Sequence, residues 1–564
     1  MRRHLAAVLV VSLAFPALAA SPAPAVGARG MVVAPERQAA EIGVSVLKSG
    51  GNAIDAAVAM AIALAVTYPR AGNLAGGGFL LYRAPDGTYR ALDFRETAPA
   101  ALTPASFFGA DGKPDTEKSK YSGLAVGVPG TVRGLLEAHG RWGTRPFDEL
   151  VAPAIRLAEE GTTVTAKSAA TYASKEEHDH LAADPAARAL FTKDGAPLPE
   201  GHRLVQKDLA ATLRLLASDK ADGFYRGRVA QAIVDTVRAK GGVMTLEDLA
   251  GYKVVERTPL EGRYRGRRIV TFPPPSSGGI VVLQALGMLE RFDMAASGAG
   301  SSLTFHRIAE AERRAFADRS RFMGDPAFVE VPTARLLAKA YVDARSRTIR
   351  DDRAIPSATI GPGDLKAEGT NTYHLTVADA RGGVVSLTST LNSWYGAAIV
   401  AAGTGLLLNN EMDDFSLAKG VANQFGLVGE KANLPAGGKR PLSSMCPTIV
   451  EDGTPGSRPL LALGSPGGAT IISAVLQTLL HVVDDGMTLQ EAVDAPRIHH
   501  QWMPDRLDYD MVGIPKDVLD ALAAKGHTLH PRAFTWNVAA IGRDGEGRWT
   551  GAADPRGEGV AIGY

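Results

Sequence analysis

Residues 372–391 of this chain are TYHLTVADARGGVVSLTSTL, a pattern of two strands joined by a tight turn. Residues 373–378 and 384–391 alternate apolar with small or polar side chains, which is typical of half-buried strands. Arg381-Gly382-Gly383 lies between them and supplies the glycines that tight turns favour. The stretch therefore predicts a β-hairpin that follows directly on Thr372.

The chain on the two sides of this hairpin differs in pattern. Residues 351–371 contain Pro356, Pro362 and several glycines with little periodic hydrophobicity, and they predict an extended, poorly ordered connector. After the hairpin, further strands are expected at 399–408, 448–450 and 460–463, and helices at 471–484, 489–495 and 516–525.

Helical periodicity dominates upstream of the connector. Residues 38–47 and 53–66 predict two helices, with Asn52 as the N-cap of the second. The second helix is apolar on all sides, so it should be buried. Other helices are expected at 150–160, 208–217, 229–240, 280–292 and 302–322, and strands at 79–83 and 89–94, so that a mostly helical first part precedes a β-rich second part.

Charge and cysteine content exclude some classes of protein. Sixty-one basic and sixty acidic residues give a net charge of +1, so there is no basic field that would collect nucleic acid. Length alone predicts about three or four domains. Cys446 is the only cysteine, so the chain has no intramolecular disulfide. A small buried side chain is a better interpretation of Cys446 than a nucleophile.

The N-terminus has the order of a secretory signal. Arg2 and Arg3 precede an apolar run at residues 5–15, and Ala17-Leu18-Ala19 supplies a site for cleavage. The alternative is a short anchor that is left uncleaved, but the run is too short for a stable membrane span. We expect residues 1–20 to be removed and the protein to be periplasmic or secreted.

Five clusters hold more small polar and charged residues than packing requires. Each alone has an ordinary structural interpretation as a turn, an ion pair or a solvated face. They are Asp93-Phe94-Arg95-Glu96, Thr370-Asn371-Thr372-Tyr373-His374, Asn409-Asn410 through Ser416, Pro441-Leu442-Ser443-Ser444-Met445, and Gly464-Ser465-Pro466-Gly467-Gly468.

Taken together and in order, these clusters resemble the γ-glutamyltransferase (γ-glutamyl transpeptidase) family of N-terminal nucleophile hydrolases. The resemblance extends over nearly the whole mature chain. It also includes residues 66–74, the Pro-Ser-Ser-Gly-Gly loop at 275–279, and residues 495–501.

The resemblance implies an α+β fold, a four-layer αββα sandwich to which two autocleaved subunits both contribute strands. The cut would fall between Asn371 and Thr372, giving a large subunit of residues 21–371 and a small catalytic subunit of residues 372–564. Thr372 would then be the nucleophile, with its own α-amine as the base. The implied activity is cleavage of the γ-glutamyl amide of glutathione and related compounds, with transfer of the glutamyl group to water, amino acids or dipeptides.

The resemblance also implies roles for the residues around Thr372. Thr390 and Asn392 would orient the nucleophile and bind substrate, and Gly467 and Gly468 would form the oxyanion hole. Arg95, Ser443 and Ser444 would bind the α-carboxylate of the substrate. Asn392, Glu411 and Asp414 would bind its α-amine. No metal, cofactor or nucleic acid is implied.

Three local departures concern the pocket. Ala75 replaces a glycine of the glycine run, and Asn371 occupies a position at which relatives vary. Residues 416–440 correspond to a loop that covers the pocket in some relatives, and Phe425 stands where an aromatic lid residue often carries a hydroxyl. A phenyl ring can cover the site but cannot donate that hydrogen bond.

Two other functions are compatible with the same pattern. A β-lactam or glutaryl-amide acylase shares the fold, but Asp414 and the carboxylate-binding residues suit a free amino acid better. An inactive relative kept as an exported binding protein is the second alternative, which the intact Thr372 and its pocket residues disfavour.

Overall fold

The computed structural model describes residues 21–360, 372–424, 426–427, 429, 431–453, 457–533 and 537–564. The predictions made for residues 1–20, Asn371 and Phe425 lie outside these residues.

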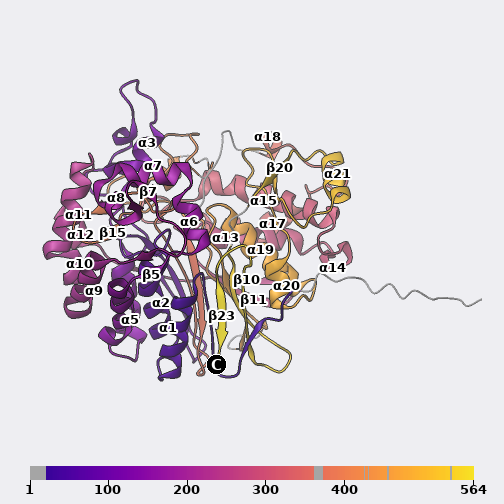
Figure 1. Cartoon of the computed structure of the whole chain (residues 1–564). Helices are drawn as coiled ribbons and strands as arrows, with labels where there is room; N and C mark the ends of the chain where they lie inside the picture. Colours follow the sequence, from indigo (N-terminus) through magenta and orange to yellow (C-terminus); the bar gives the residue numbers. More distant parts are fainter. Residues whose placement is uncertain are drawn as a thin grey trace, which may run out of the picture.

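Two antiparallel seven-stranded sheets form the centre of the molecule (Figure 1). Sheet I has the order β23 (Val560–Gly563), β2 (Met31–Ala34), β12 (Tyr373–Ala378), β13 (Val384–Thr390), β3 (Gly77–Arg83), β4 (Tyr89–Asp93) and β9 (Val255–Arg257). Sheet II has the order β1 (Ala25–Gly27), β22 (Trp549–Ala553), β21 (Ala539–Arg543), β17 (Pro459–Gly464), β16 (Thr448–Glu451), β11 (Arg267–Thr271) and β10 (Leu260–Tyr264).

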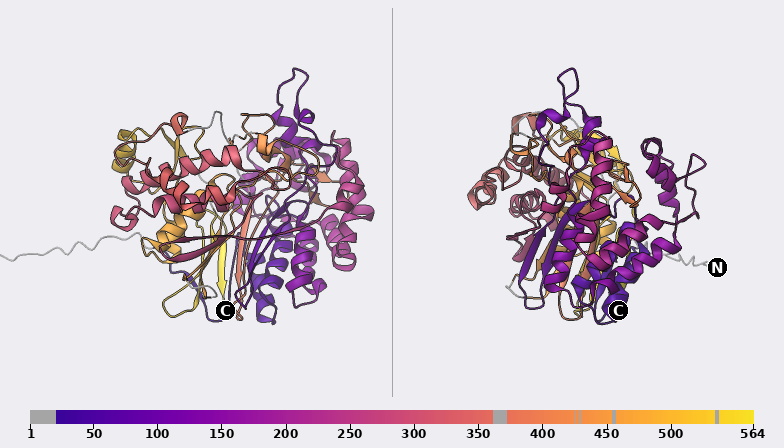
Figure 2. Two further views of the ribbon diagram at one scale, coloured as in Figure 1. Left: turned by 180° about the vertical axis from the view of Figure 1, so that it is seen from behind. Right: turned by 90° about the vertical axis from the view of Figure 1, so that its left-hand side faces the viewer.

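Helices cover the outer face of each sheet, so the layers are helix, sheet, sheet and helix, as Figures 1 and 2 show. Alternate residues of the sheet I strands pack to opposite sides: Val32 and Leu80 belong to the helix-side core, whereas Val33 and Leu81 pack toward sheet II. Sheet I is covered by α1 (Arg37–Lys48), α2 (Ala53–Thr67), α4 (Thr131–Trp142) and α5 (Phe147–Glu160), and sheet II by α13 (Gly278–Leu289), α15 (Ser302–Phe322), α19 (Thr470–Val483) and α20 (Leu489–Asp494). The expected αββα sandwich is confirmed.

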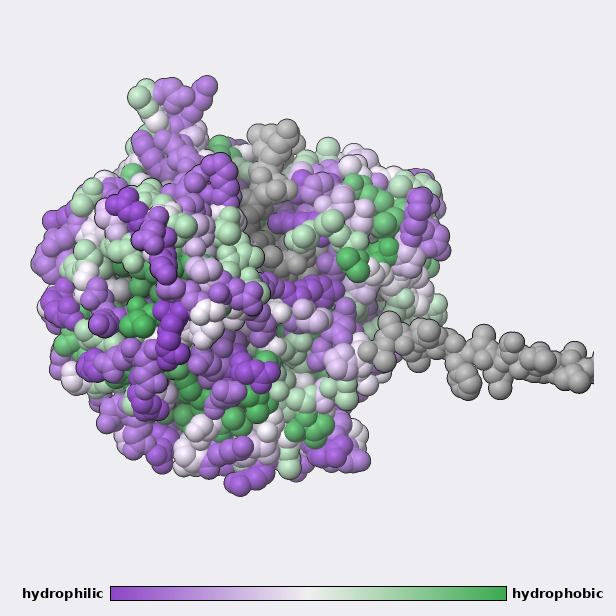
Figure 3. Space-filling view, in the orientation of Figure 1, coloured by the Kyte–Doolittle hydropathy of each residue, from purple (hydrophilic) through white to green (hydrophobic). Residues whose placement is uncertain are grey.

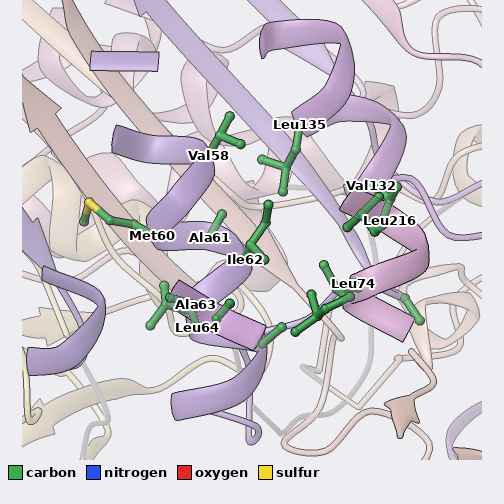
Figure 4. Close-up of a cluster of buried hydrophobic side chains, with 14 of the residues drawn as sticks. Val58, Met60, Ala61, Ile62, Ala63, Leu64, Leu74, Val132, Leu135 and Leu216 are labelled. Carbon is green, nitrogen blue, oxygen red and sulfur yellow. The ribbon is translucent and has the colours of Figure 1, made fainter. Parts of the chain in front are cut away.

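Helix α2 shows how the sequence determines one of these layers. Its side chains from Ala53 to Val66 are all buried, as its uniformly apolar sequence predicts. Asn52 caps it reciprocally, because its side chain accepts from the Asp55 amide and its own amide donates to the Asp55 carboxylate, both at 2.9 Å. Figure 4 shows Ile62 of α2 beside Leu135 of α4.

The predicted hairpin and the longest predicted helix are confirmed. Strands β12 and β13 pair antiparallel from Tyr373 opposite Ser389 to Ala378 opposite Val384. Helix α15 begins and ends where the periodicity placed it. The remaining helices include α9 (Lys207–Asp219), α11 (Gly227–Ala239), α17 (Lys339–Ser346), α18 (Ser357–Ile360) and α21 (Lys516–Ala524).

Two expectations were wrong. Residues 255–271 contain β9, β10 and β11, although this part of the chain was expected to be mostly helical. Within the expected extended connector, residues 357–360 form the short helix α18, and Ser357 is fully buried. In both places the stabilising partners come from distant parts of the chain, such as β16 beside β11 and Trp502 beside Ser357.

Within the described ranges, no helix is both long enough and apolar enough to cross a membrane. On the face shown in Figure 3, hydrophilic residues are interspersed with small hydrophobic groups.

Candidate active site

Thr372 lies directly before β12, and the strand register decides where its side chain points. Tyr373 and Leu375 pack against the helices that cover sheet I, so Thr372 and His374 face the other way, toward sheet II. Thr372 is 7% exposed, and its hydroxyl donates to Thr390 Oγ1, 3.3 Å away at the end of β13. The Thr390 hydroxyl also accepts from the Asn392 amide at 2.8 Å.

A neutral polar layer lies beneath Thr372, between the two sheets. His374 Nδ1 is 2.8 Å from Thr388 Oγ1, and its Nε2 is 3.1 Å from Thr376 Oγ1. Burial lowers the pKa of His374 to about 3, so the imidazole is neutral. Gly464 of β17 makes room for the ring, since a Cβ there would lie 2.3 Å from His374 Cε1.

Thr372 opens into a pocket that collects residues from both halves of the chain. The pocket is lined by Arg95, Thr372, Thr390, Asn392, Glu411, Asp414, Ser443, Ser444, Met445, Gly468 and Ile471. Of the predicted site residues that the structure describes, only Gly467 is absent from this lining, and it adjoins Gly468 in the chain. The residue clusters that the sequence singled out therefore meet at one place.

Arg95 forms the positive side of this pocket. Its guanidinium pairs with the carboxylates of Glu411 and Asp414. These two carboxylates raise the pKa of Arg95 above its ordinary value although burial opposes this. The backbone of Arg95 is also held, because Tyr252 Oη donates to its carbonyl at 2.8 Å and its amide donates to Asp93 Oδ1 at 3.0 Å.

Glu96 lies beside the pocket, next to Arg95, and no role was predicted for it from the sequence. It is fully buried, with Oε2 3.9 Å from Arg95 Nη1. Burial raises its pKa to about 7, and burial raises the pKa of Glu411 as well. Both acids therefore bind a proton at a higher pH than exposed glutamates do.

The acids are positioned by a pair of asparagines. Asn409 Nδ2 donates to the carbonyls of Ala75 at 2.9 Å and Gly127 at 2.8 Å, and its Oδ1 accepts from the Glu411 amide at 3.0 Å. The carbonyl of Asn410 accepts from Asn392 Nδ2 at 3.0 Å. Glu411 and Asp414 then follow on a single 3-10 turn, η3 (Glu411–Asp414), which directs both toward Arg95.

The two serines lie on a segment held by the glycine-rich loop at residues 275–279. The Ser277 amide donates to the Ser443 carbonyl at 2.8 Å, and the Ser443 amide donates to the Pro275 carbonyl at 2.9 Å. Cys446 lies behind this loop, fully buried as predicted, and burial raises the pKa of its thiol. Cys446 does not line the pocket.

Gly467 and Gly468 form the turn between β17 and α19. Their φ angles of +132° and +56° lie in the region that favours glycine. The Gly467 carbonyl accepts from the Thr470 amide at 3.1 Å. The turn thus places backbone amides at the N-terminus of α19, where the helix dipole favours a negative charge.

The described part of the 416–440 loop contacts the acid turn. Asn423 Nδ2 donates to Asp414 Oδ1 at 3.3 Å, and Asn433 Nδ2 donates to the Asp414 carbonyl at 2.7 Å. Gln424 contacts Asp413 through its amide at 2.9 Å. The loop therefore helps to fix Asp414.

Known proteins resemble the chain over its full length. The model of the gamma-glutamyltranspeptidase family matches residues 39–564. The chain is 45% identical over 574 aligned residues to the glutathione hydrolase proenzyme of Escherichia coli (strain K12), an alignment that covers 99% of this chain and 97% of that relative.

Solved structures agree with this assignment. The cephalosporin acylase from Bacillus halodurans superimposes with a TM-score of 0.85 at 28% identity and 99% coverage of both chains. A chain of Helicobacter pylori gamma-glutamyltranspeptidase gives a TM-score of 0.57 at 43% identity, covering 59% of this chain and 96% of that one. The family model and the full-length relative are decisive, and the chain belongs to the γ-glutamyltranspeptidase family.

Proposed function

We propose that this protein is a γ-glutamyltransferase and glutathione hydrolase whose precursor cuts itself between Asn371 and Thr372. The observation that carries the proposal is the pocket at Thr372, in which one hydroxyl lies beside an arginine, two acids and two serines. The products would be a large subunit of residues 21–371 and a small subunit of residues 372–564.

The lining fits the α-carbon end of a γ-glutamyl group. A guanidinium and two hydroxyls suit a carboxylate, and an aspartate and a glutamate suit an ammonium. Within the pocket, Arg95 pairs with Glu411 and Asp414. A zwitterionic ligand would replace the pairing of Arg95 with the acids by two ion pairs of its own. Its carboxylate would pair with Arg95 and its ammonium with Asp414.

Self-cleavage uses the hydroxyl of Thr372. Its Oγ1 attacks the carbonyl carbon of Asn371, and the C–N bond breaks as the hydroxyl proton passes to the departing nitrogen. An ester then joins the Asn371 carbonyl to Oγ1. Water then hydrolyses the ester, which leaves a carboxylate on Asn371 and a free α-amine on Thr372. The amine, with an ordinary pKa of about 7.7–8.0, can act as a base near neutral pH.

Turnover repeats this chemistry on a donor. The α-amine takes the Oγ1 proton while Oγ1 attacks the γ-carbonyl, and backbone amides at Gly467 and Gly468 stabilise the oxyanion. The leaving amine takes the proton, and a γ-glutamyl ester remains on Thr372. Water or the amine of an amino acid or dipeptide then attacks the ester, so the kinetics should be ping-pong.

Export is part of the proposal and rests on the charged, apolar and small-residue order of residues 1–20. The mature enzyme would then work in the periplasm or outside the cell. Mass spectrometry of the protein purified from the periplasm tests it, because a mature chain should begin near residue 20 or 21.

The deciding experiment combines N-terminal sequencing with two donors. We expect the small subunit to begin at Thr372 and the enzyme to cleave γ-glutamyl-p-nitroanilide much faster than glutaryl-p-nitroanilide. Hydrolysis of the glutaryl donor alone would instead support an acylase function. The chain is similar in structure to the cephalosporin acylase from Bacillus halodurans. A purified chain that stays at full length and is inactive would support a binding protein.

A further inference from the structure

A second arginine reaches the serines of the pocket from behind. Arg319 lies on α15, is 4% exposed, and extends toward the loop that holds Ser443 and Ser444. Its Nε donates to Ser277 Oγ at 2.8 Å, and its Nη2 donates to Ser444 Oγ at 3.3 Å. Sequence reasoning assigned it no role, since it occurs within an ordinary helical pattern.

Arg319 has neutral partners, which is unusual for a buried charge. Among the described residues, no carboxylate lies within ion-pair distance of it, and its hydrogen bonds go to hydroxyl oxygens. Burial lowers its pKa to about 10, so it remains charged at neutral pH, and Asp414 and Arg95 are near enough to act on it electrostatically. A buried cation is costly without an anion, so a negative group in this pocket would be favoured.

The direction of the hydrogen bonds shows what Arg319 does to the serines. A guanidinium can only donate, so Ser444 Oγ accepts from it and retains its own hydrogen for another acceptor. Ser443 Oγ likewise accepts, from the Met445 amide at 3.1 Å. Among the described residues neither hydroxyl donates to a protein acceptor, so both hydrogens are available to a bound anion.

Arg319 also supports Ser443 through Ser277. The Ser277 hydroxyl accepts from Arg319 Nε and donates to the Ser443 carbonyl at 2.7 Å. One guanidinium therefore orders the Ser444 hydroxyl directly and the Ser443 backbone indirectly.

We propose that Arg319 is a positioning residue for the donor's α-carboxylate, which turns Ser444 into a hydrogen-bond donor and places a second positive charge behind the carboxylate-binding serines. The inference rests on the proposed function, because it assumes that Arg95, Ser443 and Ser444 bind that carboxylate. The inference explains why these three residues would bind an anion in preference to a neutral group.

Helix α15 offers a matched control at Arg314. Its side chain is as deeply buried as that of Arg319, but it donates to Thr348 Oγ1 at 2.7 Å and pairs with Glu310 at 2.7 Å. It does not line the pocket. Arg314→Lys therefore reports the general cost of changing a buried arginine on this helix.

The test compares ligands that differ only in the α-carboxylate. The variants are Arg319→Lys, Ser444→Ala, the double variant of these two, Arg95→Lys and Arg314→Lys. For each, the KM for γ-glutamyl-p-nitroanilide and the Ki values of L-glutamate and 4-aminobutanoate are measured. We expect Arg319→Lys to raise the KM and the L-glutamate Ki about tenfold and to change the 4-aminobutanoate Ki less than twofold. Arg314→Lys should change all three less than twofold.

The double variant tests whether Arg319 acts through Ser444. We expect it to be no more than about twofold worse than the worse single variant, because both remove one interaction. Additive losses, or equal losses for the two ligands, would overturn the inference. If Arg319→Lys does not mature, Ser277→Ala replaces it, with the same ligand dependence expected at smaller size.

The same data separate this inference from the function on which it rests. Should Ser444→Ala and Arg95→Lys fail to distinguish L-glutamate from 4-aminobutanoate, the carboxylate-binding site itself is wrong and the inference falls with it. Should they distinguish the ligands while Arg319→Lys and Ser277→Ala do not, the site stands and only the role of Arg319 is wrong.

Discussion

At the scale of single residues, Thr372 combines a hydroxyl group with a buried position between the two sheets. Its side chain faces the space between the sheets, and Thr390 lies opposite it. Its neighbours on the same face are neutral, because burial keeps His374 unprotonated. In the proposed mechanism its own amine activates the hydroxyl, and the imidazole beneath it carries no charge.

Thr372→Ala should leave a full-length chain with no turnover, because one hydroxyl performs both reactions. Denaturing gels and release of p-nitroaniline measure the two effects. Thr372→Ser should retain both reactions, and Thr359→Ala, on the surface of α18, should behave as wild type. A cleaved Thr372→Ala protein would show that another group cuts the chain.

Asp414→Asn should reduce kcat/KM for γ-glutamyl-p-nitroanilide by tenfold or more, because the neutral amide no longer pairs with the donor's ammonium. Hydrolysis of glutaryl-p-nitroanilide, which has no ammonium, should fall much less. Asp413→Asn is the control, since Asp413 is also buried but contacts Ser119 and Gln424 instead of the pocket. An equal loss on both donors would argue against Asp414 as the ammonium site.

At the scale of elements, β17 lies close to β12 beneath Thr372, and Gly464 of β17 leaves room for the His374 ring. Gly464→Ala would place a Cβ 2.3 Å from the His374 ring, which is fixed by Thr388 and Thr376. We expect slower self-cleavage and a loss of about 1–3 kcal/mol of stability. Gly140→Ala is the control, because its Cβ would meet nothing within 4 Å on the exposed side of α4. Normal cleavage and stability in Gly464→Ala would show that the sheets can separate locally.

The sequence predicted the helices and strands that have strong local signals and missed those that distant segments stabilise. Helix α15 and the β12–β13 hairpin were predicted because their periodicity and turn glycines are local signals. Strands β10 and β11 were missed since their pattern is weak, and pairing of β11 with β16, almost 180 residues later, stabilises them. The helix α18 was missed for the same reason, as Trp502 and Asp505 hold Ser357 from a distant loop.

At the scale of the whole molecule, residues on both sides of the proposed cut share each sheet. In sheet I, β2 and β3 from before the cut bond to β12 and β13 from after it, and sheet II is mixed in the same way. We expect the two subunits to elute as one particle in gel filtration and to unfold together. Subunits that separate in native buffer would contradict this arrangement.

Packing of the helix layer over sheet II should also make one histidine a reporter of acid unfolding. His499 lies against Phe316 and is 2.6 Å from Ser473 Oγ, and burial lowers its pKa to about 4. The unfolded chain binds a proton there below about pH 6.5, whereas the native state does so only near pH 4. Its contribution to stability is therefore present above pH 6.5 and is lost as the pH falls toward 4.

The prediction concerns the difference between wild type and His499→Gln. The free energy of unfolding of wild type minus that of His499→Gln should fall by up to about 1.4 kcal/mol per pH unit as the pH is lowered from 6.5 to 4. Urea unfolding of both proteins at several pH values measures it. A constant difference for His499→Gln would mean that His499 titrates normally in the native state.

The sequence by itself determined the family, the fold class, the hairpin at Thr372 and the set of residues that form the pocket, because these depend on local patterns and ordered motifs. Only the tertiary structure decided how they meet: Arg95 paired with Glu411 and Asp414, Glu96 buried 3.9 Å from Arg95, and Arg319 behind Ser444. The reason is physical, since burial and hydrogen-bond direction arise from contacts between segments hundreds of residues apart.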